Sequence, residues 1–294
     1  MTVHWSDFVA FSTTSELLQR DFVQQALLAC AMLALLGGIL GPLIIARQMS
    51  FAVHGTSELS VTGAAAALLF GFGVNVGGVV GAIVAAVIFG LLGNKARERD
   101  SVIGVVLAFG LGLAVLFIAL YGRIGTGFSL LTGQVVSVGT KGLAAMTITT
   151  VVVLAVTAVV YRPLWFASTD PRVAESRGVP MRLLSVVFAV LLGATTAQAV
   201  QIIGALLVMS LLITPAAAAV KISSSPAVVV ALSVLFAEIA AVGGIVVSLA
   251  PGLPVSVFVT SISFLIYLIC RLYAWLRARP STRRNPAAAA AATT

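Results

Sequence analysis

Long apolar runs separated by short polar breaks extend along almost the whole chain. A helix needs about 20 apolar residues to cross the hydrocarbon core of a bilayer, and most of the runs are that long. They are longer and more continuous than the alternating strands of a membrane β-barrel. The pattern therefore predicts an all-α, polytopic membrane protein with about eight or nine transmembrane helices. We expect these helices near residues 22–46, 51–72, 76–93, 101–121, 141–161, 182–198, 201–220, 226–249 and 254–273.

The least regular part of the pattern is the apolar run of 39 residues at 182–220, which is too long for one span. We place a break in its "TTAQAVQ" stretch and interpret Gln198 and Gln201 as turn residues and as part of a transport pathway. Residues 122–140 are rich in Gly and Ser, which is typical of an external loop and leaves room for a short interfacial helix.

Composition agrees with a membrane location. The chain is 60% hydrophobic and 9% charged, whereas a soluble domain carries roughly 25% charged residues. Cys30 and Cys270 each lie inside an apolar run, so we expect packing or lipid-facing residues rather than a disulfide. Residues 1–21 lack an apolar core, so no cleavable signal peptide is expected.

The basic residues predict the orientation of the helices. In a nine-span arrangement, 14 of the 17 Lys and Arg residues fall on one side, which identifies that side as cytoplasmic. We therefore expect residues 1–21 to be an external segment, 22–275 a transmembrane domain, and 276–294 a disordered cytoplasmic tail. Membrane orientation accounts for the net charge of +8, so no nucleic-acid partner is expected.

Two ionisable residues interrupt the second apolar run, in "RQMSFAVHGTSELSVTG" from Arg47 to Gly63. His54 and Glu58 are four positions apart, which places both side chains on one face of a helix. The rise of a helix puts Glu58 roughly 10–16 Å above Arg47, close to the middle of the bilayer. An ionisable group at this depth costs at least a few kcal/mol and indicates function.

A further acid, Glu238 in "VLFAEIAAVGG", lies at a similar depth on another helix. Imidazole and carboxylate groups together suit a divalent transition metal, and they also suit a proton relay or a structural His–Glu pair between helices. No HExxH or CxxC motif is present, so the sequence does not indicate a tight structural metal site.

A polar segment between the fifth and sixth predicted helices has clear start and stop signals. In "STDPRVAESRGVPMRLL", Asp170 and Pro171 are typical of a helix N-terminus, and Gly178 ends the helix. We expect a helix of about two turns that docks a cytoplasmic partner, with an ordinary capped loop helix as the alternative.

Several stretches together resemble the permease subunits of bacterial ABC importers for zinc, manganese and chelated iron, over roughly residues 22–275. The second helix of that family opens with an Arg-Arg-Met-Ala-Phe-like stretch and continues with a Gly-Asp-Ala-Leu-Ser-His-like run. "DSVIGVVLAFGLGLAVL" is similar to the fourth helix of the family, "DPRVAESRGVP" to its coupling segment, and "QIIGALLVMSLLITPAAAA" to its inner helix.

The resemblance implies a transport subunit of the bacterial cytoplasmic membrane, with its N-terminus outside and its C-terminus in the cytoplasm. A second permease copy, giving a homodimer, cytoplasmic ATPase subunits and an extracytoplasmic metal-binding protein are the implied partners. Residues 170–178 would form the coupling helix, with Asp170, Pro171, Glu175 and Gly178 facing the ATPase. The chain has no GxxxxGK[ST] loop, so ATP hydrolysis belongs to a separate subunit and no catalytic residue is expected here.

The resemblance also implies a transported metal, zinc or manganese, rather than a resident cofactor. This chain has His54 where the family usually has Asp, and Glu58 where it usually has His. The ligand types are kept while their positions are exchanged. We therefore expect His54, Glu58 and Glu238 to be the metal contacts, although Glu238 rests on its depth and charge alone.

Two other functions remain open. A proton-coupled secondary transporter could use the same three residues, and it would need no ATPase. Within the ABC class, the nearest alternative is a permease for a siderophore or cobalamin, but such bulky ligands do not require a His–Glu pair. An intramembrane enzyme would need a nucleophile–base pair or a zinc motif, and the sequence has neither.

Overall fold

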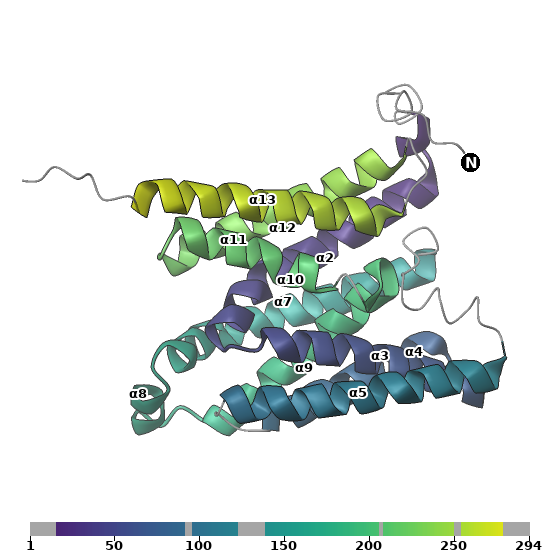
Figure 1. Ribbon diagram of the computed structural model, residues 1–294, viewed down its shortest axis with the longest axis horizontal. Coiled ribbons are helices and arrows are strands. Elements are labelled where there is room, and N and C mark those ends of the chain that lie inside the picture. The colour runs from purple at the N-terminus through teal and green to yellow at the C-terminus, as the bar shows by residue number, and fades with distance from the viewer. Residues whose placement is uncertain (1–15, 92–95, 123–138, 206–207, 250–253, 279–294) are drawn as a thin grey trace, which may run out of the picture.

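A computed structural model of the chain describes residues 16–91, 96–122, 139–205, 208–249 and 254–278. All regular structure in these residues is helical, and the helices lie side by side along one long axis (Figure 1). They are α2 (Asp21–Ala46), α3 (Ser50–Phe70), α4 (Val74–Leu91), α5 (Ala96–Tyr121), α7 (Thr140–Thr169), α8 (Pro171–Ser176), α9 (Met181–Ile203), α10 (Val208–Leu212), α11 (Thr214–Ile222), α12 (Pro226–Leu249) and α13 (Val255–Ala278).

The predicted all-α membrane fold is confirmed. Seven helices in the described part of the chain are long and apolar enough to cross a membrane: α2, α4, α5, α7, α9, α12 and α13. An eighth, α3, has 21 residues and is less apolar because it carries His54, Glu58 and several hydroxyl side chains. The short helices α10 and α11 cover most of the seventh predicted span, 201–220, and α13 corresponds to the ninth.

The predicted break at Gln198 and Gln201 is wrong. Helix α9 continues through both glutamines to Ile203, and the chain turns at Gly204, whose φ of 82° is readily adopted only by glycine. Glutamine is a good helix former and can keep its helical backbone while its amide finds a polar partner. The glycine of "QIIGALL" is therefore the actual breaker, and the predicted helix 201–220 is divided between α9, α10 and α11.

Helix α7 is longer than predicted. The pattern ended it at Tyr161 because Arg162 and Pro163 follow, but the helix continues through both residues to Thr169. Proline removes one N–H donor without ending this helix, and its last two turns carry the chain directly to α8.

The predictions for the two cysteines and for the terminal segments have different outcomes. Cys30 and Cys270 are both buried and form no disulfide, as predicted. The predicted N-terminal segment, the 122–140 loop and the 276–294 tail fall wholly or largely on residues 1–15, 123–138 and 279–294, outside the described residues.

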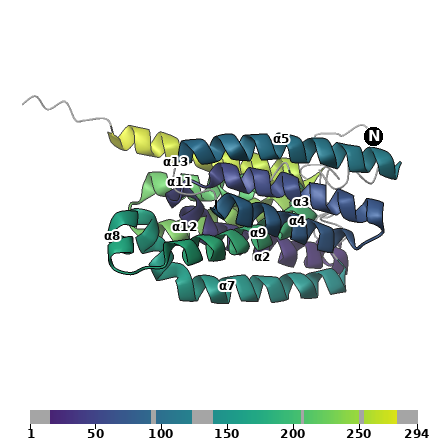
Figure 2. The same ribbon diagram turned by 90° about the horizontal axis from the view of Figure 1, so that it is seen from below.

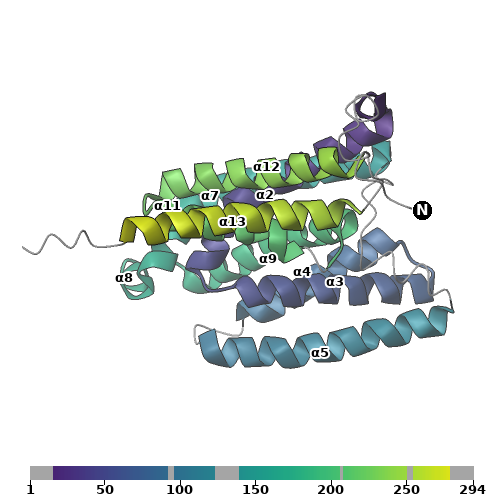
Figure 3. The same cartoon turned by 45° about the horizontal axis from the view of Figure 1, so that its top comes forward.

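The two ends of the described chain lie at opposite ends of the bundle, as an odd number of crossings requires. Helix α8 and the C-terminal end of α13 lie at one end, on the left of Figures 1 and 3, and α2 begins at the other. Helices α5 and α7 lie on opposite sides, with α3, α4 and α9 between them (Figure 2).

Helix α3 is held in the bundle by contacts that only glycine allows. A Cβ atom at Gly63 would collide with the carbonyl oxygen of Gly77, and one at Gly81 would collide with the carbonyl oxygen of Leu59. The α3 and α4 backbones therefore touch directly, which is the close approach that small residues permit between membrane helices. This seam fixes the position of the helix that carries His54 and Glu58.

A pair of glycine substitutions tests the seam. Gly63→Ala should lower the free energy of unfolding by about 1–3 kcal/mol, because the new methyl group meets backbone that cannot rotate away. The matched change Gly112→Ala on α5 meets no atom within 4 Å and should be neutral or slightly stabilising. Thermal unfolding of the purified variants in detergent measures both, and equal midpoints would contradict the direct backbone contact.

Candidate functional site

Some polar side chains of α3 form hydrogen bonds to neighbouring helices, and others do not. Ser60 donates a hydrogen bond to the Gly78 carbonyl of α4 (3.0 Å), and Thr62 donates to the Gly110 carbonyl of α5 (2.9 Å). These two hydroxyls tie α3 to its neighbours and are fully accounted for by structure.

Three residues of α3, His54, Thr56 and Glu58, have a buried polar side-chain atom without a hydrogen-bond partner among the described residues, and two of them are ionisable. Glu58 is 4% exposed, and His54 is partly buried beside the Phe51 ring. Glu58 Oε2 and His54 Nδ1 are both buried, and neither has a hydrogen-bond partner among the described residues. Ser57 bonds only to the backbone carbonyl of His54, at 2.7 Å, so it leaves the imidazole available.

The position of this pair along α3 follows from the bounds of the helix. Glu58 is the ninth residue of the 21 in α3, about 12 Å from the start of the helix. A buried acceptor without a donor costs about 1–3 kcal/mol, and more when it is charged. A cation that passes between the carboxylate and the imidazole would remove this cost.

Glu238 does not join the pair within one subunit. In the described part of the chain, no three His, Cys, Asp or Glu side chains lie close enough together to hold a metal. Helix α12 packs against α2, α11 and α13, whereas α3 packs mainly against α4 and α5 and also against α9. Within a single chain the structure therefore does not bring Glu238 to His54 and Glu58, because equal depth does not imply the same side of the bundle.

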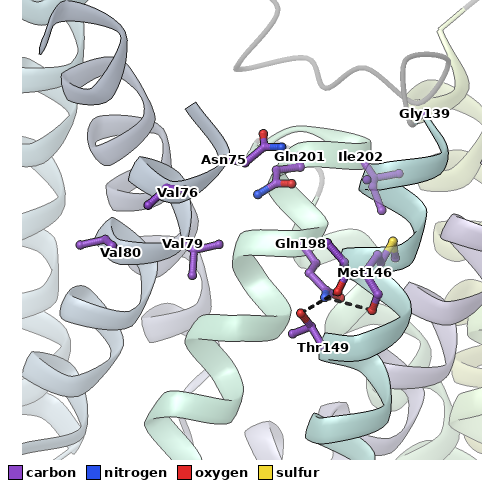
Figure 4. Close-up of a pocket in the computed structure, with 12 residues that line it drawn as sticks. Asn75, Val76, Val79, Val80, Gly139, Met146, Thr149, Gln198, Gln201 and Ile202 are labelled. Carbon is purple, nitrogen blue, oxygen red and sulfur yellow. Dashed lines mark hydrogen bonds between the residues drawn. The ribbon is translucent and has the colours of Figure 1, made fainter. Parts of the chain in front are cut away.

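Gln198 and Gln201 line a separate cavity of about 480 Å³ between α4, α7 and α9 (Figure 4). Asn75 and Thr149 also line it, from α4 and α7. Gln198 is 8% exposed and donates a long hydrogen bond to the Met146 carbonyl (3.4 Å), while its Oε1 atom is buried without a partner in the described residues. The cavity includes no residue of α3, so it is distinct from the His54–Glu58 pair.

The short helix predicted at residues 170–178 is present as α8. Its N-cap is Asp170, whose carboxylate accepts a hydrogen bond from the Val173 amide at 3.1 Å, and Pro171 occupies the first helical position. At the other end, the Gly178 amide bonds to the Glu175 carbonyl and the Val179 amide bonds to the Ala174 carbonyl. These two bonds form a Schellman motif, which requires the left-handed φ of 78° at Gly178.

Helix α8 makes little buried contact with the rest of the bundle. Ala174 is its only buried residue, and the other five are exposed. Beside it lies a polar cavity of about 670 Å³ that reaches the turn between α2 and α3. This cavity is lined by residues from both segments: Arg47, Gln48 and Met49 of the turn, and Asp170, Arg172 and Glu175 at α8.

The turn between α2 and α3 was not predicted as a functional element. It is a Schellman motif, with Gln48 at the left-handed position (φ 53°) that glycine usually occupies. The Gln48 amide bonds to the Ile45 carbonyl, and the Met49 amide bonds to the Ile44 carbonyl. Without a glycine the sequence carried no turn signal here, and only the polar "RQ" pair marked the position.

Comparison with known proteins gives one family and a consistent set of relatives. Residues 19–274 match the ABC 3 transport family. The chain is 30% identical to the manganese transport system membrane protein MntC of Halalkalibacterium halodurans, over 78% of this chain and 80% of that protein. It is 27% identical to the manganese import system permease protein ScaB of Streptococcus parasanguinis, over 91% and 94%.

A solved structure has the same fold. The structure described as PsaBC from Streptococcus pneumoniae in complex with Fab superposes with a TM-score of 0.79, covering 88% of this chain and 94% of the other. The sequence identity is 24%.

The cap of α8 can be tested without a transport assay. Asp170→Ala removes the acceptor for the Val173 amide and should destabilise α8 by about 1 kcal/mol, because Ala cannot cap. Asp170→Asn keeps an oxygen at the same place and should retain most of the cap. Hydrogen exchange of the 172–176 amides should be faster in the Ala variant than in the Asn variant, and equal rates would argue against capping by Asp170.

Proposed function

The chain belongs to the ABC 3 transport family and is the permease subunit of an ABC importer for a divalent metal; we propose that the metal is manganese and that it passes His54 and Glu58. The observation that carries this proposal is the pair of buried atoms on α3, Nδ1 of His54 and Oε2 of Glu58, that lack hydrogen-bond partners in the described structure. Family membership also sets aside the proton-coupled transporter and the siderophore or cobalamin permease as explanations of the same residues.

The chemistry of the pair suits a transported Mn²⁺ ion. Carboxylate oxygen and imidazole nitrogen are ordinary manganese ligands, and neither binds as tightly as the thiolates that select zinc or copper(I). A transported ion must leave as well as enter, so few ligands and moderate affinity are an advantage. Thr62 and Ser60 take no part, because their hydroxyls are bonded to neighbouring helices.

A second copy of the chain would complete the coordination. Manganese favours an octahedral set of ligands, and no third His, Cys, Asp or Glu in the described part of one subunit joins His54 and Glu58. Two subunits related by a two-fold axis would supply two imidazoles and two carboxylates, with a charge of −2 that balances Mn²⁺. Water would fill the remaining positions. We therefore propose a homodimeric permease with the metal pathway between the two α3 helices.

We further propose that ATPase subunits dock at α8 from the cytoplasm. The end of the bundle that carries α8 is also the end at which α13 finishes, which agrees with a cytoplasmic C-terminus and an external N-terminus (Figure 1). Asp170, Pro171 and Gly178 define the short helix, and Glu175 is exposed on it. An extracytoplasmic binding protein would deliver the metal at the opposite end, and ATP hydrolysis would take place in the separate subunits.

Uptake of Mn²⁺ into vesicles tests the metal contacts. In vesicles that contain permease, ATPase and binding protein, His54→Ala and Glu58→Ala should each reduce ATP-dependent uptake by roughly 10- to 100-fold or more, since each removes a direct ligand. Glu58→Gln, which keeps the shape and removes the charge, should be nearly as harmful.

Glu238→Gln is the matched control. It neutralises an acid that is expected at a similar membrane depth but lies on α12, which does not pack against α3. It should retain most of the uptake. Wild-type uptake by the His54→Ala, Glu58→Ala double variant would show that the pair is structural, and the proposed metal contacts would then be wrong.

A charge reversal on α8 tests the docking role. Glu175→Arg should reduce metal-dependent stimulation of the ATPase by about 5-fold or more, because it changes an exposed docking charge without touching the membrane helices. Ser176→Ala is the control on the same helix, since the Ser176 hydroxyl bonds only to the nearby Val173 carbonyl. ATP hydrolysis by the purified complexes measures both, and undiminished stimulation in Glu175→Arg would count against docking at α8.

A further inference from the structure

The turn that joins α2 to α3 is rigid at its backbone. Its two Schellman hydrogen bonds, Gln48 to Ile45 and Met49 to Ile44, are 3.0 and 2.9 Å long. Met49 is 2% exposed, so the turn is also anchored by a buried side chain. Helix α3 begins at the next residue, and His54 follows one helical turn later. A displacement of this turn would therefore move the start of the helix that carries the proposed metal contacts.

Arg47 connects the turn to α9. Its guanidinium lies over the ring of Phe188, with 5.2 Å between the guanidinium carbon and the ring centroid. Phe188 is fully buried, so the ring is a fixed platform within the bundle. A desolvated contact of a cation with an aromatic face is directional, and it gives Arg47 a defined place against α9.

The two helices beside this contact, α4 and α9, are also held together. Ser185, one turn before Phe188, donates a hydrogen bond to the Gly90 carbonyl at 2.8 Å, which ties α9 to the end of α4. A Cβ atom at Gly90 would lie 2.7 Å from the Cβ of Ala189, so these two helices are in close contact. At this end of the bundle α4 and α9 therefore act as one body, and the α2–α3 turn lies next to it.

The cavity of about 670 Å³ separates the turn from α8 and gives α8 room to move. Arg47 lines it from the turn, and Asp170, Arg172 and Glu175 line it from α8. The two acids outweigh Arg172, so attraction between the net negative charge of these α8 residues and Arg47 favours closure of the cavity. Because α8 is buried only at Ala174, a docked partner could shift it without breaking much packing.

We propose that Arg47 is a positioning residue that passes a displacement of α8, across this cavity, to the α2–α3 turn and so to the start of α3. Movement of α8 towards the turn brings its carboxylates closer to Arg47 and shifts the guanidinium relative to the Phe188 ring. The rigid turn transmits that shift to Ser50 and to the two metal contacts above it. This role rests on the proposed docking of an ATPase at α8, and it assigns to Arg47 the coupling of that docking to the metal pathway.

The first test compares three variants in vesicles that contain the whole complex. Arg47→Ala should leave assembly with the ATPase and basal ATP hydrolysis intact, and should lower the Mn²⁺ moved per ATP hydrolysed by about tenfold. Arg47→Lys keeps the positive charge but not the planar group, and should recover part of this ratio. Arg182→Ala is the matched control, because Arg182 is exposed at the same end and lies outside the cavity.

Binding of Mn²⁺ to the complex without ATP separates positioning from folding. A positioning role predicts an affinity within about twofold of wild type in Arg47→Ala, because the ligands themselves are intact. If Arg47→Ala moves as much Mn²⁺ per ATP as Arg182→Ala does, the proposal is overturned. A variant that loses assembly or Mn²⁺ affinity together with transport would also overturn it, since Arg47 would then be a structural residue.

A distance measurement tests the same link without relying on manganese uptake. Spin labels at Arg177→Cys, after α8, and Phe51→Cys, in the first turn of α3, are placed in a complex whose Cys30 and Cys270 are replaced by alanine. Nucleotide binding should change the label-to-label distance by about 2 Å in the otherwise wild-type and Arg182→Ala complexes, and by much less in Arg47→Ala. The same change in all three complexes would refute the role of Arg47, whereas absent Mn²⁺ uptake by the wild type would refute only the proposed substrate.

Discussion

The structure depends on the requirement that polar groups inside a bilayer find partners within the protein. Helix α3 carries several polar side chains, and the hydroxyls of Ser60 and Thr62 are bonded to the backbones of neighbouring helices. Glycines at the α3–α4 seam let those two backbones touch, so the short Ser60 side chain reaches across to α4. Among the described residues, atoms on His54, Thr56 and Glu58 stay without partners, and the proposed function follows from the two ionisable ones.

The sequence predicted the membrane fold and the position of this exception because both depend on local, one-dimensional signals. Apolar run length gave the helices, and i, i+4 spacing placed His54 and Glu58 on one face. Helix α8 was predicted for the same reason, since Asp170 and Gly178 act within their own turn. The depth of each residue could likewise be counted from the nearest polar break.

What the sequence did not predict depends on which helices become neighbours. Glu238 has the right depth, but α12 packs away from α3, and no periodic pattern reports that choice. Gln198 and Gln201 were interpreted as a turn because polarity was taken as a break, whereas the helix ends at the backbone freedom of Gly204. The break between α2 and α3 was predicted at its observed place, but its Schellman geometry was not, because Gln48 occupies a left-handed position without the usual glycine.

The seam between α3 and α4 also limits how this protein can change over generations. At Gly63, Gly77 and Gly81 any side chain larger than hydrogen meets the backbone or Cβ of the facing helix. These positions are not among the proposed metal contacts, yet they have less freedom to vary than His54 and Glu58, since an acid and an imidazole can exchange places whereas no other residue has glycine's shape. Under the proposed function, side chains on α3 can change and alter the choice of ion, but only while the glycine backbone at the seam stays the same.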